Sequence, residues 1–400
     1  MNAPQMNAPQ IKSGETAQRP LPPMLTFAMA ASAGLGAANI YYNQPMLGHI
    51  EAAFGTGIGG LVPTATPLGY ALGLFCLVPL SDILDRKRVI LVQFGLLALA
   101  LALAAWSPNG WVLVAASFLI GVSACVAQQI VPFAAHLAPA EKRGAVVGIV
   151  MAGLLSGILL SRTLAGFVAS HYGWREMFWL AVPMALGTAL WLAFVLPSSR
   201  GESRLGYGRL MLSLLHLWRE LPALRRAALI QACLFGAFSV FWTVLALRLQ
   251  QPPFGLGAEV AGLFGVVGLV GVAAAPITGR IADAKGPQRV ILLGCLLVLL
   301  SWMILGLWPS LVGMVLGVIL LDFAAQAVLV SNQHVIYALR ADARARLNTL
   351  FMSMMFLGGA AGSALAMLAW QWAGWMAVSA LGALFALAGL LLQLSARRPA

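Results

Sequence analysis

Two ionisable residues lie inside long apolar stretches of this chain. Asp322 lies near the middle of a run from 311 to 334, and Arg162 lies about two-thirds of the way along a run from 145 to 168. If such runs cross a bilayer, an ionised side chain there costs at least about 2.5–3.5 kcal/mol and needs a partner or a function. A low dielectric favours the neutral form of a carboxyl group, so Asp322 could take up and release a proton. The alternative is a structural aspartate held by a neighbouring helix.

Amide and aromatic side chains accompany these charges in the apolar stretches. The candidate binding set is Asn39, Tyr42, Asn43, Gln44, Gln128, Gln129, Gln231, Trp242, Asn332 and Gln333. Together they could hydrogen-bond a small molecule, while Phe235, Phe238 and Phe241 could supply an apolar wall beside Trp242. Amides also join helices within membranes at about 0.6–2 kcal/mol per contact, so a structural role for any single one stays open.

Composition identifies the elements that must position these residues. The chain is 61% hydrophobic and 9% charged, and its mean hydropathy is +0.90. A soluble globule could not bury so much apolar surface, so we expect an all-α integral membrane protein. About 20 apolar residues cross a bilayer as a helix, and twelve such runs are predicted. Their approximate cores are 24–46, 59–80, 89–106, 111–136, 145–168, 175–196, 227–249, 257–279, 289–308, 311–334, 348–370 and 375–394.

The basic residues predict the orientation of these spans. Of the 24 lysines and arginines, all but Arg162, Arg175 and Arg248 fall in the tails or on one set of alternate loops. Short cytoplasmic loops collect such residues, so both termini are expected in the cytoplasm and the protein in the cell inner membrane. The net charge of +12 therefore reflects topology, and nucleic acid is not an expected partner.

The chain repeats itself at one offset. Asp82 and Asp283 lie 201 residues apart, as do Gly173 and Gly374. Tandem halves of this kind are typical of membrane transporters. We therefore predict two six-helix halves at 23–196 and 227–394, a disordered tail over 1–22, a cytoplasmic linker over 197–226 and a short tail over 395–400. Apolar residues within the linker could form one face of a short helix lying on the inner leaflet, namely Leu210, Leu214, Leu217, Trp218 and Leu221. The alternative is a solvated linker.

The loops after the second and eighth spans carry a recognisable pattern. PLSDILDRKRV at 79–89 and TGRIADAKGPQRV at 278–290 resemble the G-x-L-A-D-R-x-G-R-K signature of the major facilitator superfamily. The first copy is degenerate, because Asp85 stands where the second glycine belongs. The resemblance covers the whole chain and implies the major facilitator fold, with spans one, four, seven and ten around a central cavity.

Further motifs resemble one branch of that superfamily. IYYNQPML at 40–47 and SNQHVIYALR at 331–340 are similar to the bacterial drug and sugar efflux proteins near the arabinose-efflux permeases. Two features of proton-coupled exporters are altered. Ser117 stands where an arginine is usual, and the glycine-rich antiporter pattern of span five has lost its proline and ends at Arg162.

The resemblance implies a secondary transporter that works by alternating access. Proton-coupled efflux of a drug, sugar or metabolite is expected, and a metabolite uptake symporter or a uniporter is the alternative. Energy would come from a proton gradient with no bound cofactor or metal, and a monomer is the family default. An enzyme is not expected because the five histidines are scattered and no acid-rich motif accompanies them. A sensor derived from a carrier would bind a ligand without moving it.

The resemblance also assigns roles to charged residues. Asp322 falls on a cavity span and becomes the candidate for proton coupling. Asp82, Arg86 and Asp283 lie at inner helix ends, where a carboxylate could bond to the N-terminus of a neighbouring helix and hold an inner gate shut. Arg162 lies on span five, at the boundary between the halves, which favours gating or structure. Pairing with Asp322 or with a helix carbonyl end, or binding of an anionic substrate, remains open for Arg162.

Overall fold

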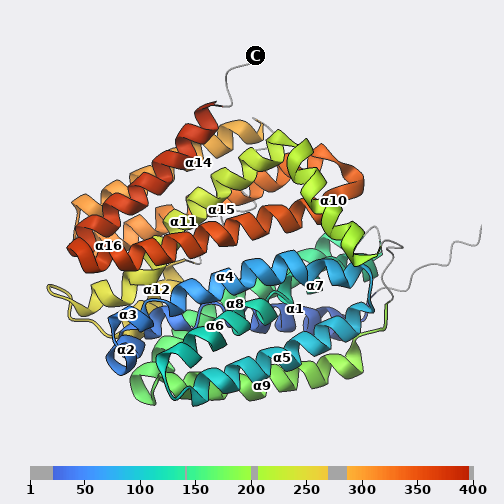
Figure 1. The fold of residues 1–400 in the computed structure, drawn as a ribbon, viewed down its shortest axis with the longest axis horizontal. Helices are drawn as coiled ribbons and strands as arrows, with labels where there is room; N and C mark the ends of the chain where they lie inside the picture. The colour runs from blue at the N-terminus through green and yellow to red at the C-terminus, as the bar shows by residue number, and fades with distance from the viewer. Residues whose placement is uncertain (1–20, 140–141, 200–205, 269–285, 396–400) are drawn as a thin grey trace, which may run out of the picture.

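The computed structural model describes residues 21–139, 142–199, 206–268 and 286–395, and within these ranges the chain is helical with no strand. Figure 1 shows two bundles side by side, the earlier part of the chain in one and the later part in the other. The first bundle contains α1 (Pro23–Ala38), α2 (Asn43–Phe54), α3 (Thr56–Gly59), α4 (Val62–Cys76), η1 (Val78–Asp82), α5 (Arg86–Trp106), α6 (Gly110–Ala124), α7 (Ala127–Leu137), α8 (Arg143–His171) and α9 (Trp174–Val195). The second contains α11 (Pro222–Gln250), α12 (Ala258–Val267), α14 (Pro287–Leu307), α15 (Leu311–Leu339), η3 (Ala341–Ala343) and α16 (Arg344–Ser395), with α10 (Tyr207–Glu220) between the bundles in sequence.

The long helices confirm the predicted fold class. In the described residues, 10 helical segments are long and apolar enough to cross a membrane. The last of them includes α16, which holds two spans because Ala373 and Gly374 leave the helical conformation. Gly374 has a φ of 59°, which a glycine adopts without strain. Helix α12 begins the predicted eighth span, whose remaining residues lie outside the described ranges.

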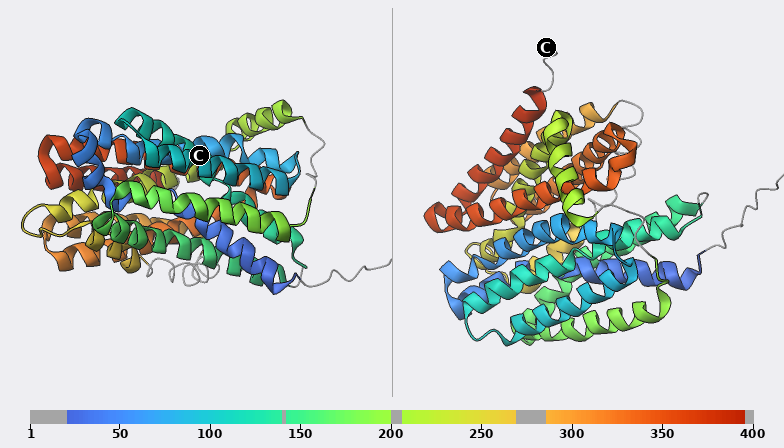
Figure 2. Two further views of the ribbon diagram at one scale, coloured as in Figure 1. Left: turned by 90° about the horizontal axis from the view of Figure 1, so that it is seen from below. Right: turned by 45° about the vertical axis from the view of Figure 1, so that its right-hand side comes forward.

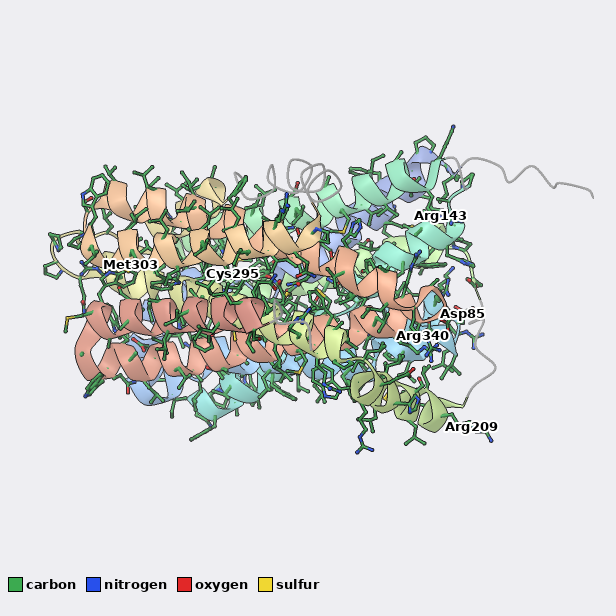
Figure 3. The ribbon with its side chains drawn as sticks, turned by 90° about the horizontal axis from the view of Figure 1, so that it is seen from above. Asp85, Arg143, Arg209, Cys295, Met303 and Arg340 are labelled. Carbon is green, nitrogen blue, oxygen red and sulfur yellow. The ribbon has the colours of Figure 1, made fainter. Side chains whose placement is uncertain are left out.

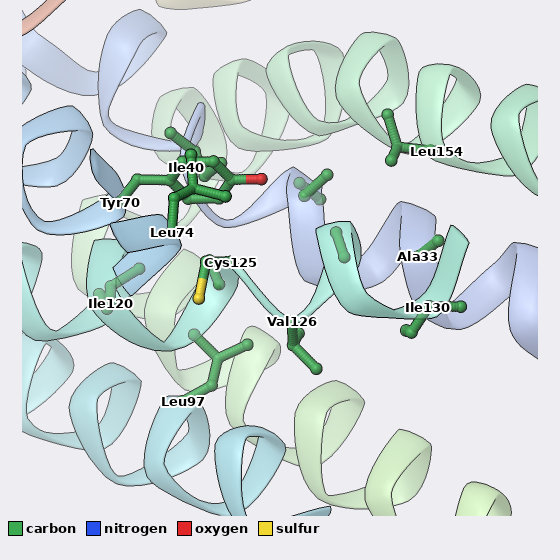
Figure 4. Packing of buried hydrophobic residues seen from close by; sticks show 14 of the residues in the cluster. Ala33, Ile40, Tyr70, Leu74, Leu97, Ile120, Cys125, Val126, Ile130 and Leu154 are labelled. Carbon is green, nitrogen blue, oxygen red and sulfur yellow. The ribbon is translucent and has the colours of Figure 1, made fainter. Parts of the chain in front are cut away.

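Two spans that we predicted as continuous helices are each interrupted. The first span is broken between α1 and α2 at Asn39–Tyr42, where the Tyr41 N–H bonds to the carbonyl three residues back, on Ala38. Pro45 explains this break, because a proline has no N–H and its ring clashes with the carbonyl four residues earlier. The fourth span is broken at Cys125 and Val126, between α6 and α7, as Figure 4 shows. Interrupted helices expose backbone polar groups and commonly mark the binding sites of transporters.

The segment between the bundles differs from the prediction. Helix α11 already begins at Pro222, so the last residues of the predicted linker 197–226 belong to a transmembrane helix. Helix α10 does form, but its Leu210, Leu214 and Leu217 are buried against the rest of the protein, and α10 contacts α11, α16 and η1. The expectation that its apolar face lies on the inner leaflet is therefore wrong, because protein already covers that face.

Glycines allow the helices to approach closely. Within the bundles, they occur at the contacts α1 with α8, α4 with α6, and α11 with α16. Between the bundles, a Cβ on Gly166 of α8 would lie 2.5 Å from the Ala258 carbonyl oxygen of α12. The Thr163 hydroxyl donates to the Gly262 carbonyl at 3.2 Å in the same contact. Close backbone approach of this kind is a common way for membrane helices to associate, and here it joins the two halves.

Several charged residues from both halves lie at one end of the molecule. Figure 3 shows Arg143, Asp85, Arg340 and Arg209 at the same end, whereas Met303 lies toward the other. Two further views in Figure 2 show the long helices running between these ends. Asp85 caps α5 by accepting the Arg88 N–H at 3.0 Å. An aspartate at an N-cap satisfies backbone N–H groups that the helix leaves free, which accounts for Asp85 in place of the signature glycine.

Candidate functional site

Arg162 is held by the first half of the chain. It lies on α8 and is 2% exposed. Its Nε donates to Gln44 Oε1 at 2.8 Å, and its guanidinium carbon lies 4.5 Å from the centre of the Tyr41 ring. Gln44 is in the first turn of α2, and Tyr41 is in the break before it. The interruption of span one therefore presents an amide and an aromatic face to the same cation.

Trp242 of α11 covers the guanidinium from the second half. The Arg162 guanidinium carbon lies 3.9 Å from the centre of the Trp242 ring, well within the range of a cation–π interaction. The Trp242 indole Nε1 donates to Asp322 Oδ1 of α15 at 3.3 Å. Trp242 and Asp322 are 1% and 9% exposed, so this bond is buried in the interior. The cation and the carboxylate are thus connected through one indole ring.

The pairing of Arg162 with Asp322 that the sequence left open is not a direct ion pair. Among the described residues, no carboxylate lies within 4.0 Å of the Arg162 guanidinium. Helix α12 and its C-cap residue bring glycines against both charges. A Cβ on Gly265 would lie 3.1 Å from Arg162 Cβ, and one on Gly268 would lie 2.5 Å from Asp322 Oδ2. Any larger residue at Gly268 would displace the carboxylate.

One donor of Arg162 is left without a partner. Its Nη2 is buried and has no hydrogen-bond acceptor in the described part of the protein. A buried donor without an acceptor costs about 1–3 kcal/mol, and more when it is charged. An acceptor from a bound molecule could therefore contribute binding energy at this position.

Aromatic rings continue from Trp242 along the boundary between the bundles. Phe238 lies 6.0 Å from Trp242, and Phe235 stacks on Phe238 at 5.3 Å, as measured between ring centroids. Phe235 in turn lies 5.1 Å from Phe356 of α16, which lies 4.2 Å from Tyr70 of α4. This ladder joins the halves and gives the site an apolar side. Phe241 also lies 5.5 Å from Trp242, edge to face, but its other ring contacts are with Trp302 and Trp375 within the second bundle, so it does not extend the ladder toward the first half.

Several amides of the candidate set bond to neighbouring helices. In the first half, Asn43 Nδ2 donates to Thr66 Oγ1 at 2.9 Å, and Gln129 Nε2 donates to the Leu77 carbonyl at 3.3 Å. Asn39 Nδ2 donates to the Leu35 carbonyl of its own helix at 2.6 Å. The Asn43 and Gln129 bonds fasten the interrupted spans to their neighbours, which is the structural role that the sequence left open, whereas the Asn39 bond stays within its own helix.

The second half uses its amides in the same way. Asn332 Nδ2 donates to Gln231 Oε1 at 3.3 Å, which joins α15 to α11. Gln333 Nε2 lies 3.5 Å from Asn348 Oδ1 at the start of α16. Of the predicted set, the structure brings Gln44 and Trp242 to the two charges. Tyr42 and Gln128 are placed elsewhere, Tyr42 against a lateral pocket and Gln128 beside the Tyr70 side chain.

The lateral pocket is separate from the charges. It has a volume of about 520 Å³ and is lined by residues of α1, α8, α9 and α12, among them Tyr42, Phe167 and Glu259. Phe167 is 45% exposed, so the pocket opens toward the side of the bundle that faces lipid. Neither Arg162 nor Asp322 lines it.

The residues predicted to hold an inner gate are Arg86, Asp82 and Asp283. Arg86 Nε lies 3.4 Å from the Ser81 carbonyl, and its guanidinium lies 5.8 Å from the centre of the Phe133 ring, so its contacts are within the first half. Asp82 ends η1, and Asp283 lies outside the described residues. The gating role of these residues stays a prediction.

Sequence reasoning missed Tyr41. It is 8% exposed and forms one of the two aromatic faces of the Arg162 site, although it stands next to the predicted Tyr42. The signal that could have found it is Pro45, because a proline predicts a break one turn earlier and so places Tyr41 in irregular backbone.

Comparison with known proteins identifies the family. The Major Facilitator Superfamily model matches residues 26–363 and 227–400, so the chain belongs to this superfamily. It is 41% identical to the uncharacterized transporter YgaY of Escherichia coli O157:H7 over 378 residues, or 93% of this chain and 95% of that protein. It is 32% identical to the probable transporter SCO4007 of Streptomyces coelicolor over 359 residues, or 88% and 83% of the two chains. The crystal structure of a D-xylose-proton symporter shares the fold, with a TM-score of 0.71 at 16% identity over 91% of this chain and 96% of that one. The protein is therefore a multi-pass membrane transporter.

Proposed function

We propose that this protein moves a small organic compound across the inner membrane by alternating access, driven by protons that bind to Asp322. The supporting observation is the connection from Asp322 through Trp242 to Arg162. Asp322 and Trp242 belong to one half and Arg162 to the other, so the charge of one carboxyl group acts across the boundary that alternating access must open.

The charge state of Asp322 sets the strength of that connection. An ionised Asp322 attracts the Arg162 guanidinium and strengthens the hydrogen bond from the Trp242 indole, because charge-assisted bonds are the stronger kind. A protonated Asp322 attracts the guanidinium less and accepts a weaker bond. Proton binding therefore lowers the free energy needed to part the halves at this level, and this change is what couples a proton to a conformational switch.

Two directions of transport follow from the same site. The resemblance to efflux proteins supports export in exchange for protons, and uptake together with protons is the second candidate. Uptake together with protons is supported by the altered antiporter pattern of span five. Arg162 occupies the end of that pattern and forms part of the site. Both directions place the termini in the cytoplasm, as the basic residues at one end support, and both work in a monomer.

Transport into liposomes tests the proposal. Purified protein is reconstituted with an internal pH dye, a pH gradient is imposed, and drugs, sugars, amino acids and carboxylic acids are added one at a time. We expect one class of compound to trigger proton movement, and the sign of that movement separates exchange from co-transport. A compound that equilibrates across the bilayer without moving protons would contradict proton coupling and indicate a facilitator. Binding without flux would indicate a sensor.

A further inference from the structure

The Arg162 guanidinium is buried with donors to spare. The Tyr41 and Trp242 rings pack against it, and Gln44 accepts from its Nε, so the Nη edge is the side where another acceptor can bond. Nη2 on that edge has no acceptor among the described residues although Arg162 is 2% exposed. Arg162 therefore has a buried N–H group, on a positively charged side chain, that can donate to a bound molecule.

Among the described residues, no anion contacts the Arg162 guanidinium. The titratable groups that face it are Tyr41 from the break in span one and Asp322 from α15, while α12 presents glycines at this contact. Asp322 accepts from Trp242 and lies against Gly268, outside ion-pair distance of the guanidinium. A planar guanidinium binds a carboxylate through two parallel hydrogen bonds, and an uncharged acceptor would leave its charge uncompensated.

We propose that the cargo is a small organic anion whose carboxylate binds the Nη edge of Arg162. This inference rests on the transport function proposed above and names its substrate class. The aromatic ladder gives the remainder of the cargo a surface, since Phe235 and Phe238 are half-buried on the same side of α11 as Trp242. A carboxylate attached to an apolar or aromatic body fits these two features together.

The location of the site links the anion to the proton. Arg162, Tyr41 and Gln44 belong to the first half, and parting the halves takes Trp242 and Asp322 away from them. The cargo carboxylate then replaces Asp322 as the charge that compensates Arg162, and Asp322 takes up a proton. Each ligand favours the binding of the other, because such coupling is reciprocal. The anion and the proton therefore cross in the same direction, which supports co-transport over exchange.

Thermal unfolding of the purified protein tests the anion site with simple carboxylates as probes. The probes are pairs of acid and amide at pH 6: acetate and acetamide, lactate and lactamide, benzoate and benzamide. We expect at least one carboxylate to raise the unfolding midpoint while its amide does not, and Arg162→Gln to abolish the shift. The matched control is Arg248→Gln, since Arg248 also lies over aromatic rings, those of Phe254 and Trp375, but should leave the shift unchanged.

Two results would overturn the anion site: carboxylates that stabilise no more than their amides, or a shift that persists in Arg162→Gln. Arg162→Lys is a second variant in case Arg162→Gln does not fold. It keeps the positive charge but loses the planar guanidinium that binds a carboxylate through two bonds. We expect this variant to elute as wild type on size exclusion and to bind the carboxylate at least about tenfold more weakly.

The pH dependence separates this inference from the proposed function. In wild type, carboxylate affinity should rise by up to about tenfold per unit fall in pH, the limit for one linked proton. In Asp322→Asn the affinity should not vary with pH. If the wild-type affinity for the carboxylate does not change with pH, the anion site is supported and its link to proton binding is contradicted. If carboxylates do not stabilise the protein, the anion proposal is rejected. Proton coupling is then decided separately by the liposome experiment.

Discussion

The guanidinium carbon of Arg162 lies 3.9 Å from the centre of the Trp242 ring, across the boundary between the two halves of the protein. Trp242 also donates to Asp322, so one side chain contacts both the Arg162 guanidinium and the Asp322 carboxylate. Substitutions of Trp242 can therefore test the connection while both charges stay in place.

Trp242→Phe removes the indole N–H and keeps an aromatic face for Arg162. We expect proton-driven transport to fall by about tenfold or more, because a hydrogen bond to a charged group contributes about 1.5–3 kcal/mol. The measurement is the initial rate of uptake or release in liposomes under a fixed pH gradient. Trp302→Phe is the matched control, since the buried Trp302 Nε1 has no acceptor in the described ranges. Equal rates for the two variants would contradict a specific role of the Trp242 N–H.

Gly166→Ala tests the close contact between α8 and α12. The added Cβ would lie 2.5 Å from the Ala258 carbonyl oxygen, so the two helices must separate. Overpacking of this kind costs about 1–3 kcal/mol, and we expect a lower unfolding midpoint together with slower transport. Gly148→Ala on the same helix is the control, because a Cβ there meets nothing within 4 Å. The contact has no role in joining the halves if both variants unfold at the same temperature.

Asp85→Ala tests why the first copy of the signature departs from the family pattern. Loss of the N-cap should lower the free energy of unfolding by about 1 kcal/mol, since the Arg88 N–H loses its acceptor. Asp85→Asn keeps a capping oxygen and should be near wild type. Denaturant or thermal unfolding in detergent measures both variants. An Asn variant as unstable as the Ala variant would show that the charge of Asp85, and not its capping hydrogen bond, stabilises the protein.

The sequence predicts the long apolar helices and places Asp322 within one of them, because hydrophobic length is a local property. It does not predict which residues of distant spans meet. Arg162 and Gln44 are separated by 118 positions, and their contact depends on how α2 and α8 are rotated about their axes. The amides show the same limit: Asn332 and Gln44 look alike in sequence, yet one fastens α15 to α11 and the other contacts the central cation. The break in span one was foreseeable from Pro45 alone.

The most direct test of the central claim compares two kinds of transport in Asp322→Asn. In counterflow, labelled cargo exchanges for unlabelled cargo without net proton movement, whereas accumulation against a gradient requires the proton. Because asparagine can still accept from the Trp242 indole but cannot titrate, we predict counterflow near the wild-type rate and no accumulation driven by a pH gradient. Asp342→Asn, at an exposed position in η3 directly before α16, should show both activities. Wild-type accumulation in Asp322→Asn would contradict the assignment of proton coupling to Asp322.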